Sequence, residues 1–521
     1  MPDALALSML APLALVPVIL MALARPGKRP GGLPRWSEGA AFASFAIAFA
    51  GLVQTALVSS PGLSLLDGPF ALGLRSDLVA ASMAALVGFI GWIVMRYSRT
   101  YLDGEAREGA FHGLMLTALA AVLVFVQAGT LPTLILAAII VGLALKRLLL
   151  FYPDRAEARR AATKFALVWH MGDAMLLIAA ALLFAKFGSL DLATLELASR
   201  TAGPGLAGTL GIAAIVAAAA LKTAAFPLHG WLTEVMEAPT PVSALLHAGI
   251  INSGGVLLIT AAGLVQQSTG AMAALVMIGG FTALFGAAVM LTQSAIKTAL
   301  AWSTVSQMGF MLLQCGLGLW TLALLHIIAH SLYKAHAFLS SGNAVAEVAS
   351  IRRPGPVAVP SVPAVLKSFA LALAIFAAIA TGFSVAFGPK SPQALALGAI
   401  LIFGVAYLVA QGLAGRAPAA LTTRTISAAL AAAIGYFTFQ TIAQGIWGPL
   451  LPAVPAPTAL EWALLVVAVA SFGIVAFAQA LFPLWAHHPA TAALRVHLAN
   501  GLYLNALLDR AIGGFRTTTT R

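Results

Sequence analysis

Residues 217–249 read AAAALKTAAFPLHGWLTEVMEAPTPVSALLHAG and combine apolar runs with ionisable side chains. Lys222 follows a run of alanines, Pro227 comes shortly after it, and His247 lies inside the next apolar segment. Proline removes a backbone donor and frees carbonyl groups, and such a break at membrane depth is tolerated where it packs in protein or lines water. The stretch therefore predicts a broken membrane helix with a lysine beside the break.

The composition of the whole chain is typical of a membrane protein. Of its 521 residues 61% are hydrophobic and only 9% are charged, and the mean hydropathy is +0.97. Soluble domains carry about 25% charged residues, so this chain could not cover a globule with polar surface. The net charge of +12 would suit nucleic acid, but the basic residues form short clusters between apolar runs, as cytoplasmic loops do. We therefore exclude nucleic acid as a partner and expect the lipid bilayer as the solvent.

The chain holds a single cysteine, Cys315, in an apolar run. One cysteine excludes a disulfide within the chain and a cysteine-ligated iron–sulfur cluster, and its surroundings favour a buried, inert thiol. The first apolar segment, residues 4–24, follows a start without basic residues, so we expect a retained span rather than a cleaved signal.

Apolar stretches of membrane-spanning length recur along the whole chain. A spanning helix needs about 20 such residues, and the pattern predicts an all-α polytopic membrane protein with about 15 transmembrane helices. The stretch 206–236 is too long for one crossing, as expected for the broken helix. The predicted spans are residues 4–24, 38–59, 76–95, 110–129, 131–150, 164–187, 206–236, 241–265, 271–292, 297–317, 319–343, 364–387, 393–412, 425–447 and 458–483.

Basic clusters follow the odd-numbered spans, whereas the loops after even-numbered spans carry mainly Arg75, Arg200 and Lys390. Basic loops stay on the cytoplasmic side, so we expect a periplasmic amino terminus and a cytoplasmic carboxyl terminus in a bacterial inner membrane. The clustered residues are Arg25, Lys28, Arg29 and Arg35; Arg96, Arg99 and Arg107; Lys146, Arg147, Arg155, Arg159, Arg160 and Lys164; Arg352 and Arg353; Arg416 and Arg424; and Arg495, Arg510, Arg516 and Arg521.

Ionisable side chains inside apolar helices are the main functional signal. A central lysine or aspartate costs about 2.5 to 3.5 kcal/mol to insert, and such residues usually line ion or proton routes. The residues in question are Asp173 beside His170, Lys222, His247, Lys297, His326, His330, Lys334 and His336.

Three of these residues, His326, His330 and Lys334, are each four positions apart and therefore share one helix face. They would form a file with about 6 Å per step, along which histidine and lysine could pass protons. A zinc site at His326 and His330 is the weaker interpretation, because a third ligand is lacking and Lys334 would repel the cation. A purely structural role suits any one of these residues, but it explains the set poorly.

The tail, residues 487–514, has leucines at roughly helical spacing among polar residues. We expect an amphipathic helix lying on the cytoplasmic face or on a partner. A solvated, irregular tail is the alternative.

Three motifs carry a resemblance to a known family: LKTAAFPLHGWL, AIKTALAWSTVSQMGFM and HIIAHSLYKAHAFLSSG. Over residues 110–345 the chain resembles the antiporter-like subunits of respiratory complex I and of Mrp-type sodium/proton antiporters. The resemblance implies two inverted five-helix repeats, each with a broken helix. It also implies a proton path through Lys222, His247, Lys297, His326, His330 and Lys334, with Asp173 as an acidic partner.

The expected organisation follows from this resemblance. It comprises amino-terminal helices (1–109), a first repeat (110–265), a second repeat (266–412), carboxyl-terminal helices (413–486) and the tail (487–521). The chain departs from the family in two respects that bear on the path. Ile139 stands where the family usually has a glutamate in the fifth span, and only Lys390 is offered near the second break.

The LLHAGIINSGG variant and the tail sequence RVHLANGLYLNALLDR resemble the membrane subunit of DAB inorganic-carbon accumulation complexes. This resemblance implies a cytoplasmic DabA-like zinc protein as the partner, similar to β-carbonic anhydrases, that hydrates CO2 to bicarbonate. The membrane subunit would supply proton or sodium flow. Zinc would belong to the partner, so we expect no cofactor, metal or catalytic site of this chain's own.

Candidate contacts with such a partner are Glu234, Glu237, Arg495 and His497, although the two glutamates could equally belong to a solvated loop. Two other functions remain open. One is a proton-pumping subunit of complex I or of an Mrp antiporter. The other is a non-conducting membrane anchor for a soluble enzyme.

Overall fold

The computed structural model describes residues 6–58, 62–64, 68, 70–341, 361–412, 419–485 and 488–511. The basic residues Arg352, Arg353, Arg416, Arg516 and Arg521, used above for orientation, lie outside this described part. Thirteen described helices are long and apolar enough to cross a membrane, so the protein is an all-α multi-pass membrane protein. Each predicted span overlaps a helix, but two of these helices, α14 and α18, are not among the thirteen.

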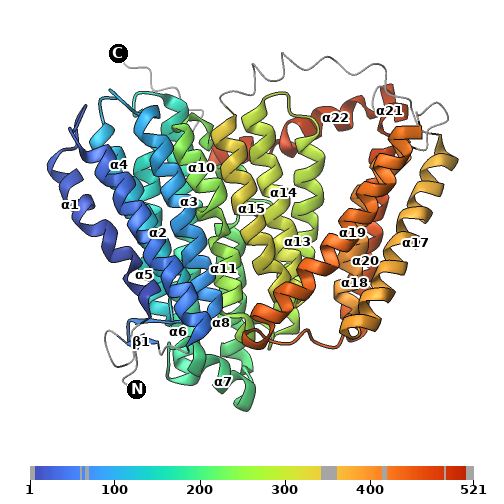
Figure 1. Cartoon of the computed structure of the whole chain (residues 1–521), viewed down its shortest axis with the longest axis horizontal. Coiled ribbons are helices and arrows are strands. Elements are labelled where there is room, and N and C mark those ends of the chain that lie inside the picture. Colours follow the sequence, from blue (N-terminus) through green and yellow to red (C-terminus); the bar gives the residue numbers. More distant parts are fainter. Residues whose placement is uncertain are drawn as a thin grey trace.

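The helices fall into consecutive groups along the chain (Figure 1). The first group comprises η1 (Leu7–Leu15), α1 (Val16–Ala24), α2 (Leu33–Leu57), α3 (Leu78–Tyr101), α4 (Glu108–Val126), α5 (Leu131–Leu149), α6 (Ala156–Phe187), α7 (Leu192–Ala202), α8 (Gly205–Lys222), α9 (Gly230–Thr233), η2 (Val235–Glu237), α10 (Thr240–Ala248), η3 (Ile250–Asn252), α11 (Ser253–Thr260) and α12 (Ala262–Val265). The two-residue strands β1 (Leu63–Ser64) and β2 (Gly73–Leu74) pair antiparallel.

The second group comprises α13 (Thr269–Met290), α14 (Ile296–Gly316) and α15 (Trp320–Ser340). The last comprises α17 (Val362–Phe387), α18 (Pro392–Gly412), α19 (Ala419–Trp447), η4 (Gly448–Leu450), α20 (Ala459–Ala480), α21 (Phe482–Trp485), η5 (Pro489–Thr491), α22 (Ala492–Ala499), η6 (Gly501–Tyr503) and α23 (Leu504–Ala511).

Small residues bring α13 and α14 into close contact. A Cβ atom on Gly309 would lie 2.4 Å from the backbone nitrogen of Ala283, and one on Gly279 would lie 2.4 Å from that of Leu313. Membrane helices have little hydrophobic drive toward one another, so close backbone approach is a main source of their packing energy. These glycines fix the helix that carries Lys297 against the body of the protein.

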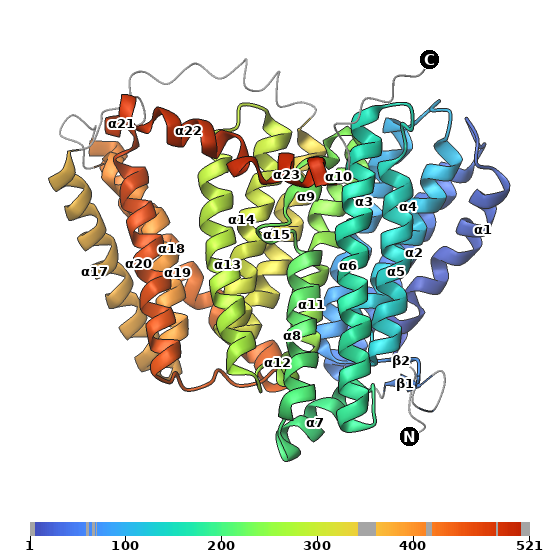
Figure 2. The same ribbon diagram turned by 180° about the vertical axis from the view of Figure 1, so that it is seen from behind.

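The helices α17 to α20 form a separate group that leans away from α13–α15 (Figure 1). Helix α19 crosses back under α15, where Trp447 Nε1 donates to Ser82 Oγ of α3 at 3.2 Å. The tail then returns over one face of the molecule as α22 and α23 (Figure 2). The space between α13–α15 and α17–α20 is called the wedge below. It has these helices on both sides and the tail across one end (Figure 2).

Two helix interruptions lie in and just after residues 217–249. Helix α8 ends at Lys222, and the chain from Thr223 to His229 is irregular before α9 begins, as the Pro227 signal predicts. The next crossing is also divided, because α10 ends at Ala248 and the short η3 precedes α11. The apolar pattern of residues 241–265 gave no indication of this second interruption.

The segment in which the family resemblance implies a second broken helix has no interruption within α17 (Val362–Phe387). Helix α17 runs without interruption to Phe387, and the chain turns at Gly388, whose φ of +88° suits glycine. Lys390 follows in this turn and donates to Thr441 Oγ1 at 3.4 Å. Burial lowers the pKa of Lys390 below its usual value.

Basic loops gather on the face that carries α23. There Arg29 lies 3.9 Å from Asp103, and Arg155 lies 3.2 Å from Glu237. Arg160 lies 3.8 Å from Asp509 of α23 itself. The opposite end of the bundle carries β1, β2 and α7 (Figure 2).

Candidate functional site

Asp173 and Lys222 form a buried ion pair between α6 and α8. Lys222 Nζ lies 2.6 Å from Asp173 Oδ1, and the lysine side chain is 0% exposed. The other oxygen, Asp173 Oδ2, lies 2.9 Å from His170 Nδ1, and that histidine is 40% exposed. The acidic residue that the resemblance implies for the path, Asp173, thus contacts Lys222, and it comes from α6 rather than from α5, where Ile139 stands.

Trp169 covers this ion pair. The lysine Nζ lies 4.0 Å from the centroid of the Trp169 ring, a cation–π contact. The indole Nε1 donates to the carbonyl of Ala138 at 3.0 Å, which fixes the ring. Gly142 leaves room for it, since a Cβ there would lie 2.5 Å from Trp169 Cδ1. The aromatic ring therefore holds the lysine in one position within the helix bundle.

A second polar row joins α10, α14 and α15. His247 Nδ1 lies 3.1 Å from Thr304 Oγ1, whose hydroxyl donates to the carbonyl of Leu300 at 3.0 Å. Lys334 Nζ donates to the same carbonyl, also at 3.0 Å. His247, Thr304 and Lys334 are all buried. Three helices thus contribute to one continuous hydrogen-bonded row.

Lys334 differs from Lys222 in its surroundings. Within the described part of the chain no carboxylate lies within ion-pair distance of Lys334 Nζ. Its hydrogen-bond acceptor is a neutral backbone carbonyl, and its Nζ lies 5.5 Å from the centroid of the Tyr333 ring. A lysine without an acid partner can release its proton without leaving a carboxylate unpaired.

Lys297 lies at the end of this row nearest the face with α23. Its Nζ donates to Thr240 Oγ1 at 3.2 Å, and the hydroxyls of Thr240 and Tyr101 are 3.3 Å apart. Lys297 begins the same helix whose Leu300 and Thr304 belong to the row. The predicted residues Lys297, His247 and Lys334 are therefore brought together around the first turns of α14.

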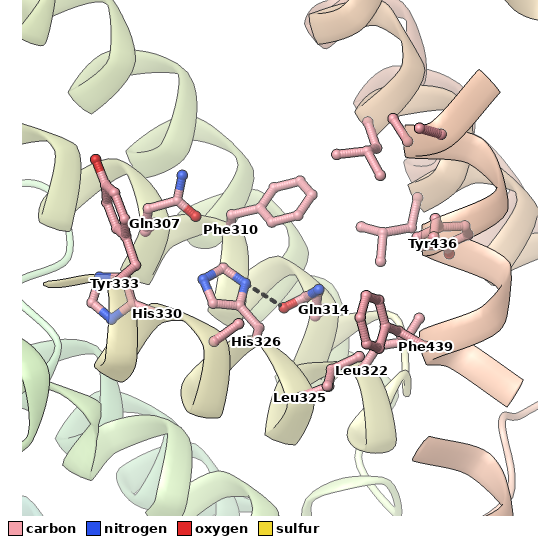
Figure 3. A pocket seen from close by; sticks show the side chains of 16 residues that line it. Gln307, Phe310, Gln314, Leu322, Leu325, His326, His330, Tyr333, Tyr436 and Phe439 are labelled. Carbon is pink, nitrogen blue, oxygen red and sulfur yellow. Dashed lines mark hydrogen bonds between the residues drawn. The ribbon is translucent and has the colours of Figure 1, made fainter. Parts of the chain in front are cut away.

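His326 and His330 continue the row along α15 into a cavity (Figure 3). Their ring centroids are 6.0 Å apart, and His326 Nδ1 lies 2.9 Å from Gln314 Oε1. His330 is buried, and neither of its ring nitrogens has a hydrogen-bond partner among the described residues. An unpaired buried ring nitrogen is costly unless water or a ligand reaches it.

The cavity has a volume of about 630 Å³ and lies between α14–α15 and α18–α19. Its α14–α15 wall is partly polar and includes Gln307 and Tyr333 beside the two histidines, whereas the opposite wall is mostly apolar and includes Phe439 (Figure 3). This volume can hold several waters against the polar wall. The histidine file therefore opens on a space large enough to hydrate it.

The two polar groups are separated by the interruption at Gly249. One cavity of about 10 Å³ lies between Trp169 and Gly249, and another of about 10 Å³ lies between Gly249 and Ser331 of α15. A volume of this size holds about one water molecule. Asn252, beside the second cavity, donates to Ser331 Oγ at 2.9 Å. Both cavities are lined mainly by apolar side chains; the hydroxyl and amide groups beside them are Ser253 in the first and Asn252 and Ser331 in the second.

A third cluster lies where the tail meets the broken helix. Lys164 of α6 is 0% exposed, and its Nζ lies 2.5 Å from both Glu234 Oε1 and Asp509 Oδ1. The amide of Asn505 accepts from Lys164 Nζ at 2.7 Å and donates to Glu234. Arg160 lies 3.7 Å from Glu234. The sequence pattern placed Lys164 in a basic cluster at the start of the span 164–187, whereas α6 already begins at Ala156, and Lys164 links the tail to the broken helix.

The candidates for partner contacts lie around η2 and on α22. Glu234 is engaged within the chain, whereas Glu237 is 40% exposed and pairs with Arg155 on the surface. Arg495 and His497 are on α22, and the His497 ring lies 5.6 Å from that of Tyr503. In the described part of the chain, no three histidine, cysteine or carboxylate side chains gather as metal ligands would.

Comparison with known proteins assigns the family. Residues 128–387 match the model of the NADH:quinone oxidoreductase/Mrp antiporter transmembrane family. The chain is 37% identical over 490 residues to the probable inorganic carbon transporter subunit DabB2 of Halothiobacillus neapolitanus, covering 91% of this chain and 87% of that one. The chain belongs to the DabB branch of the antiporter-like membrane-subunit family.

A second relative and a solved structure agree. This DabB-family chain is 42% identical over 287 residues to the probable inorganic carbon transporter subunit DabB of Hydrogenovibrio crunogenus, covering 54% of each chain. The Mrp complex from Dietzia sp. matches with a TM-score of 0.58 at 23% identity, covering 98% of this chain and 60% of that one. The latter shows a shared fold.

Sequence reasoning missed several residues of the DabB-family site. Thr304 and Leu300 both lie in the motif AIKTALAWSTVSQMGFM. Thr304 follows Lys297 by seven residues, so the two side chains share one helix face, and this spacing could have marked Thr304. Trp169 directly precedes His170, which the pattern did mark. Asp509 and Asn505 gave no signal, because their partners lie at the other end of the chain.

Proposed function

We propose that this chain is the proton- or cation-conducting membrane subunit of an energy-coupled inorganic-carbon uptake complex in a bacterial inner membrane. The observation that carries the proposal is the hydrogen-bonded row from His247 through Thr304 and the Leu300 carbonyl to Lys334. Buried, linked ionisable groups in a membrane bundle mark a proton route. Membership of the DabB branch supports inorganic carbon as the purpose of that route.

The route we propose runs along α14 and α15. Protons pass between Lys297, at the end near α23, and the row of Lys334, Thr304 and His247, then along His330 and His326 to the cavity. Because the Leu300 carbonyl only accepts hydrogen bonds, a water must carry the proton past it. Lys334 and His326 are eight residues apart on one helix, which corresponds to about 12 Å along the helix axis. The ring nitrogens of His330, which have no hydrogen-bond partner among the described residues, support a route that ends at the cavity, because waters there would bond to them.

The Asp173–Lys222 pair has a different role in this proposal. A proton that reaches the pair neutralises Asp173, and the lysine then loses the partner that compensates its charge. The electrostatic field at the Gly249 interruption changes at that step. The pair therefore acts as an electrostatic switch beside the conducting row. Its change of charge favours one conformation of the broken helix over another.

Coupling to a partner would use the tail. We propose that α23 lies on the cytoplasmic face and that a DabA-like zinc protein docks there, with Glu237 and His497 among its contacts. Asp509 and Asn505 of the tail contact Lys164 and Glu234 beside the broken helix, so a movement of the tail would shift these contacts and with them the broken helix. The partner would hydrate CO2 to bicarbonate in one direction as protons or sodium flow down their gradient.

Two experiments test this function. The full chain, purified with an affinity tag, should retain one large soluble zinc protein. Recovery of NADH dehydrogenase subunits or small Mrp subunits would instead favour the complex I or Mrp alternative. Reconstituted in liposomes, the complex should carry protons or sodium under an imposed gradient. Absence of any ion flux would favour a non-conducting anchor.

In cells that depend on the complex for growth in air, Lys222→Ala should abolish growth, and growth like that of the wild type would discard the assigned role. Lys186→Ala provides a matched control, because Lys186 is an exposed lysine on the same helix as Asp173. Growth of the control variant should be unchanged.

A further inference from the structure

Another large cavity lies at the α22 end of the wedge, away from the row of His247, Thr304 and Lys334. It has a volume of about 520 Å³ and is enclosed by the end of α13, by α20 and α21, and by α22. This volume is within the range of about 300–1,000 Å³ that small-molecule sites occupy. Figure 2 shows α22 lying across the gap between α13 and α20 at this end of the bundle.

The walls of this cavity are apolar and incompletely covered. Leu291 is 50% exposed, Phe482 is 41% exposed and Leu494 is 50% exposed. Leu291 and Phe482 lie just beyond the ends of α13 and α20, so the cavity is at the depth where spanning helices end. Apolar surface at this depth is covered by acyl chains. The cavity is therefore continuous with the lipid of the bilayer.

One charged side chain lines the cavity. Arg495 of α22 is the single ionisable residue among the fifteen that line it, and no acidic residue is among them. Within the described part of the chain, Arg495 forms no ion pair. An arginine at the headgroup level, beside apolar walls, matches a phosphate-bearing headgroup above acyl chains.

The cavity also has a fixed geometry. Gln293 Nε2 donates to the carbonyl of Ala499 at 3.3 Å, which fastens the end of α22 to α13. Thr491 Oγ1 donates to the carbonyl of Trp485 at 2.7 Å, and Trp485 Nε1 donates to the carbonyl of Ala478 at 2.8 Å. These bonds hold both ends of α22, and with it Arg495, over the cavity.

We propose that this cavity binds one anionic phospholipid, with its acyl chains between α13 and α20 and its phosphate at Arg495. The bound lipid fills the wedge beneath α22 and holds the α17–α20 group against the rest of the bundle. A free phosphate would leave the apolar walls uncovered, whereas a zwitterionic lipid would bring a second charge of the wrong sign to the arginine. This site does not depend on proton conduction.

The test measures lipid retained by the full chain, together with any subunits that co-purify, after exhaustive washing in detergent. The probes are palmitoyl-oleoyl phosphatidylglycerol and the phosphatidylcholine with the same acyl chains, counted by native mass spectrometry. The wild type should retain about one phosphatidylglycerol and little phosphatidylcholine. Arg495→Gln should weaken phosphatidylglycerol binding about fivefold, the effect of one basic residue near an anionic surface.

Two further variants keep the test decisive. Arg510→Gln removes the same charge from the same tail but lies outside the cavity, so lipid retention should be unchanged. Ala288→Phe fills the cavity and should displace the lipid whatever its headgroup. A photoactivatable phosphatidylglycerol should label peptides of α13 and α20 in the wild type and lose that labelling in Ala288→Phe.

Several results would overturn the proposal. Equal retention of the two lipids would remove the anionic selectivity, and unchanged binding in both Arg495→Gln and Ala288→Phe would remove the site. An equal loss in Arg510→Gln and Arg495→Gln would show only a general charge effect. Labelling of a protein partner in place of lipid at these peptides would assign the cavity to that partner.

Discussion

Asp173 Oδ1 lies 2.6 Å from Lys222 Nζ, so the lysine of the broken helix has a carboxylate partner on α6. The lysine side chain is 0% exposed and the aspartate side chain 6% exposed. Breaking such a buried pair leaves one uncompensated charge and costs about 3–5 kcal/mol, whereas replacing both partners with apolar residues can be neutral. Stability and conduction can therefore be separated at this site.

We expect Lys222→Met alone to destabilise the protein and to abolish proton flux in liposomes. The double variant Lys222→Met with Asp173→Leu should regain most of the wild-type melting temperature in detergent and still conduct at least tenfold less than wild type. Restored flux in the double variant would mean that the pair has only a structural role.

Thr304 gives a sharper test of the hydrogen-bonded row. Thr304→Val keeps the shape of the side chain and removes the hydroxyl between His247 and the Leu300 carbonyl. Flux measured with a pH-sensitive dye should fall about tenfold or more, while the melting temperature changes little. Thr209→Val is the matched control, because Thr209 is a half-buried threonine on α8 whose hydroxyl donates to the Gly205 carbonyl of its own helix. Equal flux in the two variants would contradict the route.

The histidines of α15 provide an internal comparison. His330 is buried beside the cavity, whereas His336 on the same helix is exposed. His330→Ala should reduce proton flux strongly, and His336→Ala should leave it within about twofold of wild type. If both substitutions have the same effect, the cavity is not part of the proton route.

The tail cluster predicts a measurable loosening. Asp509→Asn removes one of the two carboxylates that contact Lys164, and a hydrogen bond to a charged group contributes about 1.5–3 kcal/mol. Hydrogen exchange should become faster across α23 and in the segment from α9 to η2. Glu237→Gln, which removes a surface ion pair with Arg155, should change exchange little. Unchanged exchange in Asp509→Asn would show that the tail is held by other contacts.

The family motifs marked many of the residues that the structure brings together along α14 and α15. The spacing of His326, His330 and Lys334 predicted one face of one helix, because helical geometry is local. The sequence also marked Asp173 as an acidic partner. It could not assign Asp173 to Lys222 from spacing, since that contact joins α6 to α8. It also gave no reason to expect Leu300, whose contribution is a backbone carbonyl.

The sequence alone determined that this chain is a helical membrane protein with a break beside Lys222. Both conclusions rest on local chemistry: the hydropathy of consecutive residues and the missing backbone donor of Pro227. Only the tertiary structure decided which charges neutralise one another, where the histidine file meets a cavity, and that Asp509 returns to Lys164. These depend on distances between helices far apart in the chain, which hydropathy and spacing within a helix do not specify.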